Sequence, residues 1–170
     1  MSTAPAQPEY WLRGPVEGVD PSLMPAAHAL LQTLEDAERA AADLTIDELW
    51  KTPGGAASIG FHLLHLCGST DRLLTYARGS TLNDAQKAAI GLEKNPPRTD
   101  AATLLADLRR TMDAALAQIR STPASSLLDA RAVGRAALPT TVLGLIFHAA
   151  EHSQRHAGQI VTTAKVIRAR

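Results

Sequence analysis

The sequence has few of the residues that mark secreted, membrane-spanning or nucleic-acid-binding proteins. Its one cysteine, Cys67, excludes an internal disulfide and suits a reducing compartment. The most apolar stretch, residues 141–150, is too short to span a bilayer, and residues 1–8 lack the apolar segment of a secretory signal. Lys plus Arg and Asp plus Glu number 17 each, so the chain lacks the positive field of a non-specific nucleic-acid binder. We therefore expect a cytoplasmic protein that binds neither membranes nor nucleic acid.

Aromatic residues are also scarce, at 4%, although apolar residues as a whole make up 45% of the 170 residues. Alanine and leucine dominate this apolar fraction, and both are strong helix formers, whereas strands favour aromatic and β-branched residues. The length suits one domain with a substantial core. We expect an all-α protein in which an irregular lead-in, residues 1–21, precedes a single domain, residues 22–170.

Apolar residues recur at helical spacing in four long segments, which are residues 22–43, 59–78, 100–120 and 141–167. A short helical turn is expected at 46–50, a weaker helix at 83–90, and an irregular connection at 124–139. The expected N-caps of the last three long helices are Ser58, Thr99 or Asp100, and Thr140 or Thr141. Four amphipathic helices joined by modest connections predict a four-helix bundle.

Five of the 6 histidines lie on two of these predicted helices. His148, His152 and His156 recur every four residues, and each step of four drifts by only about 40° around a helix, so they form one stripe. Two histidines at i and i+4 can bind one metal ion. His62 and His65, on the second long helix, offer a third ligand. Spacing alone leaves the choice among these five histidines open.

Two segments of the sequence carry recognisable motifs. One is Pro53-Gly54-Gly55 followed by Ser58-Ile59 and His65-Leu66, and the other is Glu151-His152-Ser153-Gln154-Arg155-His156-Ala157-Gly158-Gln159. Both resemble segments of the DinB-like (DinB/YfiT) family of metalloenzymes. The resemblance extends from about Leu23 to Thr163. It implies an up-down-down-up four-helix bundle in which His65, His152 and His156 bind a divalent ion. Nickel or zinc is expected first, then iron(II) or manganese(II). His62 and His148 stay as alternatives, either supporting a ligand or replacing one.

The resemblance also implies a class of reaction. Characterised relatives include enzymes that use a low-molecular-weight thiol as cosubstrate to open, isomerise or conjugate small electrophiles. Three imidazole ligands leave coordination positions open for such a molecule. Our leading hypothesis is a metal-dependent thiol S-transferase acting on a small-molecule substrate. A metal-dependent hydrolase and a non-catalytic, stress-associated binding bundle are the alternatives. Relatives are often dimers, so a homodimer is also considered.

Arg72 lies seven residues after His65 and therefore on nearly the same helix face. An arginine on an inner stripe needs an anionic partner. One interpretation is that Arg72 contacts an anionic group of the substrate. The other, which the residue pattern favours, is a buried ion pair, for which the sequence suggests three acids: Asp36, Glu38 and Glu151.

Two further residues near the histidines carry expectations. Gln159 lies on the face of His152 two turns on, where it could hydrogen-bond the second nitrogen of a ligand histidine. Cys67 lies about 200° around the helix from His65, so it cannot join the same site. We expect Cys67 to be a buried apolar filler.

Overall fold

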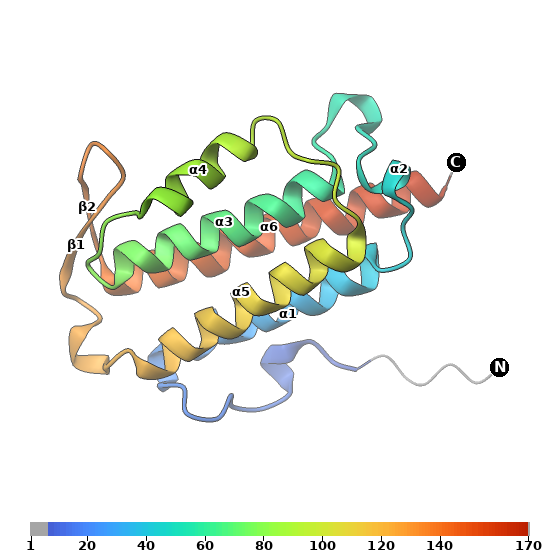
Figure 1. Ribbon diagram of the computed structural model, residues 1–170. Coiled ribbons are helices and arrows are strands. Elements are labelled where there is room, and N and C mark those ends of the chain that lie inside the picture. The colour runs from blue at the N-terminus through green and yellow to red at the C-terminus, as the bar shows by residue number, and fades with distance from the viewer. Residues whose placement is uncertain (1–6, 170) are drawn as a thin grey trace.

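Six α-helices and one two-stranded hairpin are the main elements of the described part of the chain, residues 7–169 of the computed structural model (Figure 1). The four long helices are α1 (Met24–Ala41), α3 (Ile59–Ala77), α5 (Ala101–Ser121) and α6 (Val142–Arg168). Two shorter helices, α2 (Ile46–Leu49) and α4 (Asp84–Leu92), lie in the connections. The predicted helical segments are confirmed, with small shifts at their ends.

Polar side chains begin three of the long helices where the sequence predicts caps. Ser58, Asp100 and Thr141 accept hydrogen bonds from backbone N–H groups three residues further on, at 3.1, 2.8 and 3.0 Å. At the other end of α3, Gly79 has a φ of +76°, the left-handed conformation that commonly ends a helix. The ends of the helices are therefore determined by local chemistry.

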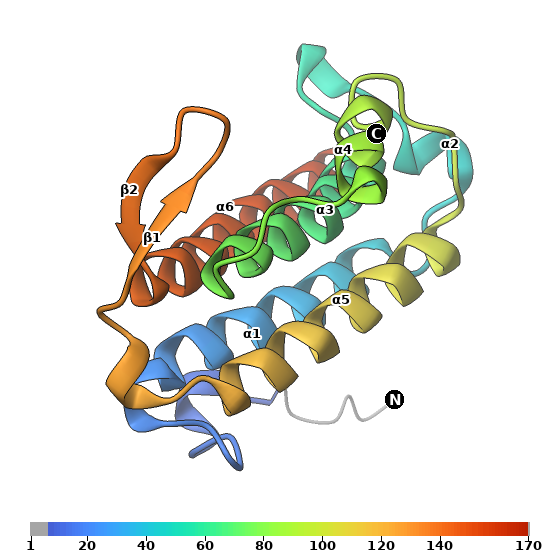
Figure 2. The same ribbon diagram turned by 60° about the vertical axis from the view of Figure 1, so that its left-hand side comes forward.

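The four long helices form an up-down-down-up bundle, as the resemblance implies. Helix α6 runs antiparallel to α3, because His62 of α3 meets His156 while the later His65 meets the earlier His152. Helices α1 and α6 run in one direction and α3 and α5 in the other, and the two pairs pack against each other (Figures 1 and 2). The all-α four-helix bundle is confirmed.

The core of the bundle is built from leucine, isoleucine and alanine on the facing sides of these helices. Fully buried members include Leu30 on α1, Leu63 on α3, Leu108 on α5, and Ile146 and Ile160 on α6. Buried alanines lie among them. Despite this apolar interior, none of the helices in residues 7–169 combines the length and hydropathy needed to cross a membrane.

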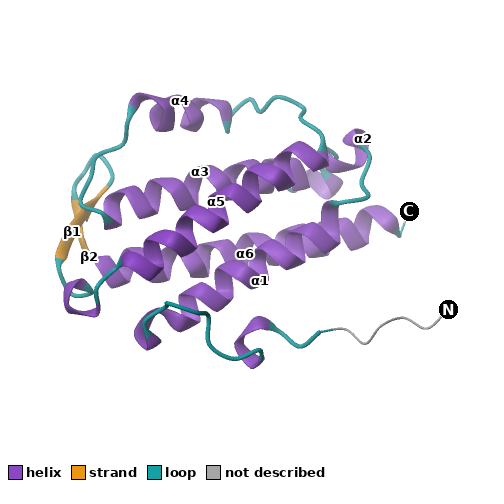
Figure 3. Ribbon diagram, turned by 60° about the horizontal axis from the view of Figure 1, so that its bottom comes forward, coloured by secondary structure: helices purple, strands orange, loops and turns teal. Residues whose placement is uncertain are grey.

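The connection before α6 differs from the prediction. Instead of an irregular segment, it contains an antiparallel hairpin of β1 (Ala130–Val133) and β2 (Leu138–Thr141), shown in orange in Figure 3. Gly134 has a φ of +74° and Ala137 one of +50°, so the tight turn uses two left-handed residues. The sequence signal was weak because each strand has only 4 residues and β2 contains Pro139. The hairpin ends at the N-cap of α6.

The lead-in is attached to α1 by polar contacts over its described part, residues 7–21. The backbone N–H of Tyr10 donates to Gln32 at 3.0 Å, and the guanidinium of Arg13 pairs with Glu35 at 2.7 Å. Residues 1–6 of the predicted lead-in lie outside the described residues.

Candidate metal centre

Three histidines from two antiparallel helices converge on one side of the bundle. His65 lies on α3, and His152 and His156 lie one turn apart on α6. One ring nitrogen from each can be chosen so that all lie within 4.8 Å of one another, close enough to share a metal ion. The three rings are 4.5 to 5.1 Å apart between centroids. This is the group that the family resemblance selected from the five histidines.

The orientation of His65 is determined by a carboxylate that the sequence analysis missed. Its Nδ1 lies 2.7 Å from Oε2 of Glu93, and its Nε2 lies 3.5 Å from Nε2 of His152. A carboxylate only accepts hydrogen bonds, so the neutral imidazole donates its proton from Nδ1. The lone pair of Nε2 then faces His152, where a metal ion could bind.

His62 lies behind the cluster and contacts His156. The two Nδ1 atoms are 2.8 Å apart, so one of them carries the proton and the other accepts it. His62 is buried, with 6% of its surface exposed, and it is not part of the converging group. Of the two roles that the sequence left open for His62, its position fits the supporting role.

His148 lies at the outer edge of the cluster, on the solvent side. Its side chain is 49% exposed and its Nδ1 lies 3.4 Å from Glu151. Its ring centroid is 5.5 Å from that of His152, and it too lies outside the converging group. His148 therefore lines the entrance to the histidine cluster.

The environment of the cluster favours neutral imidazoles. Burial, together with the neighbouring His65 and His148, lowers the pKa of His152 to about 4. Burial likewise lowers the pKa of His156 to about 3, with His152 and His65 contributing. Burial also lowers the pKa of His62, and His65 adds to the shift. A metal ion binds the neutral form of histidine, so His152 and His156 could bind one at neutral pH without first losing a proton.

Arg72 forms a largely buried ion pair, but with an acid that the sequence analysis did not consider. Its Nη1 lies 2.6 Å from Oε1 of Glu93, and both side chains are 14% exposed. The three acids suggested from the sequence, Asp36, Glu38 and Glu151, were wrong as partners. Glu93 follows the last residue of α4, and only the return of α4 across α3 brings it to Arg72 (Figure 1). Periodicity within α3 could not reveal this contact.

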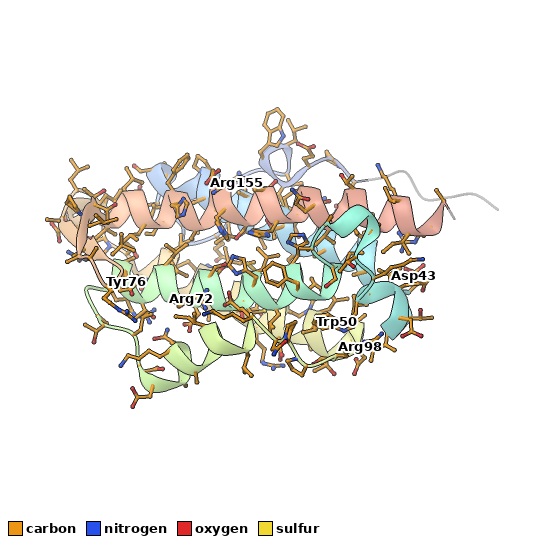
Figure 4. All side chains as sticks on the ribbon, turned by 90° about the horizontal axis from the view of Figure 1, so that it is seen from above. Asp43, Trp50, Arg72, Tyr76, Arg98 and Arg155 are labelled. Atoms are coloured by element: carbon orange, nitrogen blue, oxygen red, sulfur yellow. The ribbon has the colours of Figure 1, made fainter. Side chains whose placement is uncertain are left out.

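A cleft of about 270 Å³ opens beside the cluster, between α3, α4 and α6. Its polar wall comprises Ser69, Arg72, Tyr76, His148 and His152, and its apolar wall comprises Leu73, Leu82 and Ile90. Figure 4 shows Arg72 and Tyr76 on α3, the helix that lies between α4 and α6 in that view. The cleft therefore joins a cation and an apolar surface directly to His152.

The structure also places Gln159 and Cys67, the two further residues with predictions from the sequence. The side chain of Gln159 is exposed and makes no hydrogen bond within residues 7–169, so that prediction was wrong. Instead, Glu93 and His62 contact the second nitrogens of His65 and His156.

Cys67 lies in a groove between α3 and α5, away from the histidines, and burial raises the pKa of its thiol to about 11. A thiol with so high a pKa is unreactive, in line with its predicted role as filler.

Comparison with known protein families places the chain in one of them. The family model of the DinB superfamily matches residues 29–160. The chain belongs to the DinB superfamily. The match runs from α1 into α6 and includes His65, His152 and His156, together with Glu93. A search of curated proteins finds no significant match to this DinB-superfamily chain.

Proposed function

We propose that this DinB-superfamily protein is a divalent-metal-dependent enzyme that transfers a low-molecular-weight thiol to a small electrophile. The observation that carries the proposal is the convergence of three imidazole nitrogens within 4.8 Å, next to a cleft containing Arg72. Closed structural zinc sites have four protein ligands, whereas three histidines leave positions for an exchangeable molecule. An open site beside a cleft supports catalysis rather than a structural role.

The donor set suits nickel or zinc, with iron(II) and manganese(II) as further candidates. His65, His152 and His156 would bind the ion as neutral ligands, so the site would keep the full positive charge of the metal. When bound, such an ion lowers the pKa of a coordinating thiol, so that the thiolate forms at neutral pH. The chain's own thiol, Cys67, lies in another groove, so the nucleophile must come from a cosubstrate.

The residues around the cleft would bind and orient the electrophile. Glu93 occupies Nη1 of Arg72, and the guanidinium carries further N–H donors that could bind an anionic group. Leu73, Leu82 and Ile90 would cover an apolar part of the substrate.

In the transfer step, the thiol proton goes to solvent and the sulfur forms a bond to the electrophilic carbon. The leaving group departs with the electron pair of the broken bond.

Metal content tests the site directly. Protein purified without a histidine tag should contain about one divalent ion per chain by mass spectrometry. The double variant His152→Ala/His156→Ala should lose it, whereas His148→Ala, which removes a neighbouring histidine outside the group, should keep it. Equal metal content in the wild type and the double variant would contradict the ligand assignment.

A second experiment tests the reaction. The metal-loaded protein is offered a panel of small thiols together with a chromogenic aryl halide that carries a carboxylate. Thiol-dependent release of halide, absent from the double variant, is expected. Hydrolysis of esters or amides without any thiol would identify a hydrolase instead. A metal-loaded protein that turns over neither class would favour the non-catalytic binding bundle.

A further inference from the structure

We propose that Glu93 is a positioning residue that fixes the tautomer of His65 and holds Arg72 at the cleft. On this proposal, α4 serves to carry this carboxylate to the metal centre. The inference rests on the proposed metal site, but it concerns residues whose contacts can be measured without metal.

The carboxylate of Glu93 connects the histidine cluster with the cation of the neighbouring cleft. Its Oε2 receives Nδ1–H of His65 at 2.7 Å, and its Oε1 receives Nη1–H of Arg72 at 2.6 Å. An imidazole in water favours the tautomer with the proton on Nε2, whose lone pair would then be on the wrong nitrogen for this cluster. The contact with Glu93 reverses that preference, since the partner of one ring nitrogen decides which nitrogen carries the proton.

The helix surface beneath the ion pair is adapted to it. A Cβ atom at Gly68 would lie 2.6 Å from both Nη1 of Arg72 and Oε1 of Glu93. Gly68 lies in the middle of α3, where glycine costs about 1 kcal/mol of helix stability relative to alanine. The absence of a side chain at this position makes room for the guanidinium and the carboxylate to meet against the helix.

Polar contacts, rather than a core, attach α4 to the bundle. Its one buried residue is Gln86, whose Nε2 donates to Asp71 and to Thr75 of α3, each at 2.7 Å. Ile90, on the same helix, is 39% exposed. Glu93 provides the attachment after the other end of the helix. Because α4 contributes so little to the core, we explain it by the position of Glu93. This residue follows the C-terminal end of α4 and contacts His65 and Arg72.

Gln86 offers a matched control. The variant Gln86→Ala loosens α4 without touching His65 or Arg72, whereas Glu93→Ala removes the carboxylate itself. Gly68→Ala keeps Glu93 and crowds the ion pair, and so provides a second route if Glu93→Ala fails to fold. Circular dichroism establishes folding for each variant.

The decisive measurement is the tautomer of His65 in metal-free protein, from long-range ¹H–¹⁵N correlation spectra. We expect the Nδ1–H tautomer in the wild type and in Gln86→Ala, and mainly the Nε2–H tautomer in Glu93→Ala. Zinc titration should show a dissociation constant about 10- to 100-fold higher in Glu93→Ala than in Gln86→Ala. Gly68→Ala should change both readouts in the same direction.

Three results would overturn the inference: an Nε2–H tautomer in the wild type, an unchanged tautomer in folded Glu93→Ala, or equal zinc affinities in Glu93→Ala and Gln86→Ala. A wild-type protein that binds none of zinc, nickel, iron(II) and manganese(II) would reject the proposed function instead. The tautomer comparison, made without metal, would still show whether Glu93 positions His65.

Discussion

When two histidine ring nitrogens face each other at hydrogen-bond distance, one nitrogen carries the proton and the other accepts it. The Nδ1 atoms of His62 and His156 are 2.8 Å apart in a buried setting. If His156 binds metal through Nε2, its Nδ1 carries the proton and donates to His62. His62 is then the acceptor that keeps His156 in its ligand form, as Glu93 does for His65. The two supporting groups differ in charge, because one is a neutral imidazole and the other a carboxylate.

At the scale of single residues, we predict that His62→Ala weakens zinc binding by at least about tenfold, since loss of such a supporting contact typically costs 10- to 100-fold in affinity. The ring of His156 would lose the acceptor that orients it. Competition with a chromophoric chelator measures the effect. His28→Ala is the control, because His28 lies on α1 and contacts the carbonyl of Gly14 at 2.9 Å. Unchanged affinity in folded His62→Ala would refute the supporting role.

At the scale of elements, the junction between α2 and α3 depends on close packing at Gly60. A Cβ atom there would lie 2.6 to 2.8 Å from the indole of Trp50. The indole itself is fixed, because Nε1 donates to the carbonyl of Thr99 at 2.8 Å, just before α5. This contact joins three elements at the end of the bundle where Trp50 is labelled in Figure 4.

We therefore predict that Gly60→Ala destabilises the protein by about 1–3 kcal/mol, the usual cost of overpacking. The added methyl group must displace an anchored ring, which outweighs the better helix propensity of alanine. Urea unfolding followed by tryptophan fluorescence measures the difference. A variant as stable as the wild type would show that Trp50 can move at little cost.

The opposite outcome is expected at Gly158 on α6. A Cβ atom at this exposed position meets nothing within 4 Å. Alanine there removes the backbone freedom of glycine in the unfolded chain without a clash, so Gly158→Ala should stabilise the protein by about 0.5–1 kcal/mol. The same urea experiment tests it. A loss of stability would indicate that the position is less open than its surroundings suggest.

At the scale of the whole molecule, the partly buried histidines of the cluster make stability depend on pH. In the unfolded chain His152 and His156 take up protons near pH 6.5, but in the folded protein they do so only near pH 4 and pH 3. Between these values the unfolded state binds more protons, so the free energy of unfolding decreases as the pH falls. Burial of His62 acts in the same direction.

We predict that the melting temperature of metal-free protein falls steadily from about pH 6.5 to about pH 4. Thermal unfolding across this range measures it. The variant His152→Gln/His156→Gln should show a flatter profile, because two of the responsible groups are gone. Carboxylates with lowered pKa values, such as Glu35 beside Arg13, remain in both proteins and contribute mainly below pH 4.5. Parallel profiles would contradict the assignment to the histidines.

Local interactions allowed much of this protein to be predicted from its sequence. The helices follow from helix-forming residues and from caps such as Ser58 and Asp100, which act within one turn. The pair of His152 and His156 follows from the helical repeat alone. The family resemblance then singled out His65 over His62, although the two lie only three residues apart on α3.

The remaining features depend on how distant segments meet. The rotation of α3 against α6 placed His65 with the cluster and His62 behind it. The path of α4 brought Glu93 to both His65 and Arg72, an arrangement to which no helical repeat points. The sequence by itself therefore determined the helices and the histidine stripe, because both are properties of a few neighbouring residues. Only the tertiary structure decided which groups contact the candidate ligands, because a carboxylate far along the chain becomes a neighbour when the elements pack.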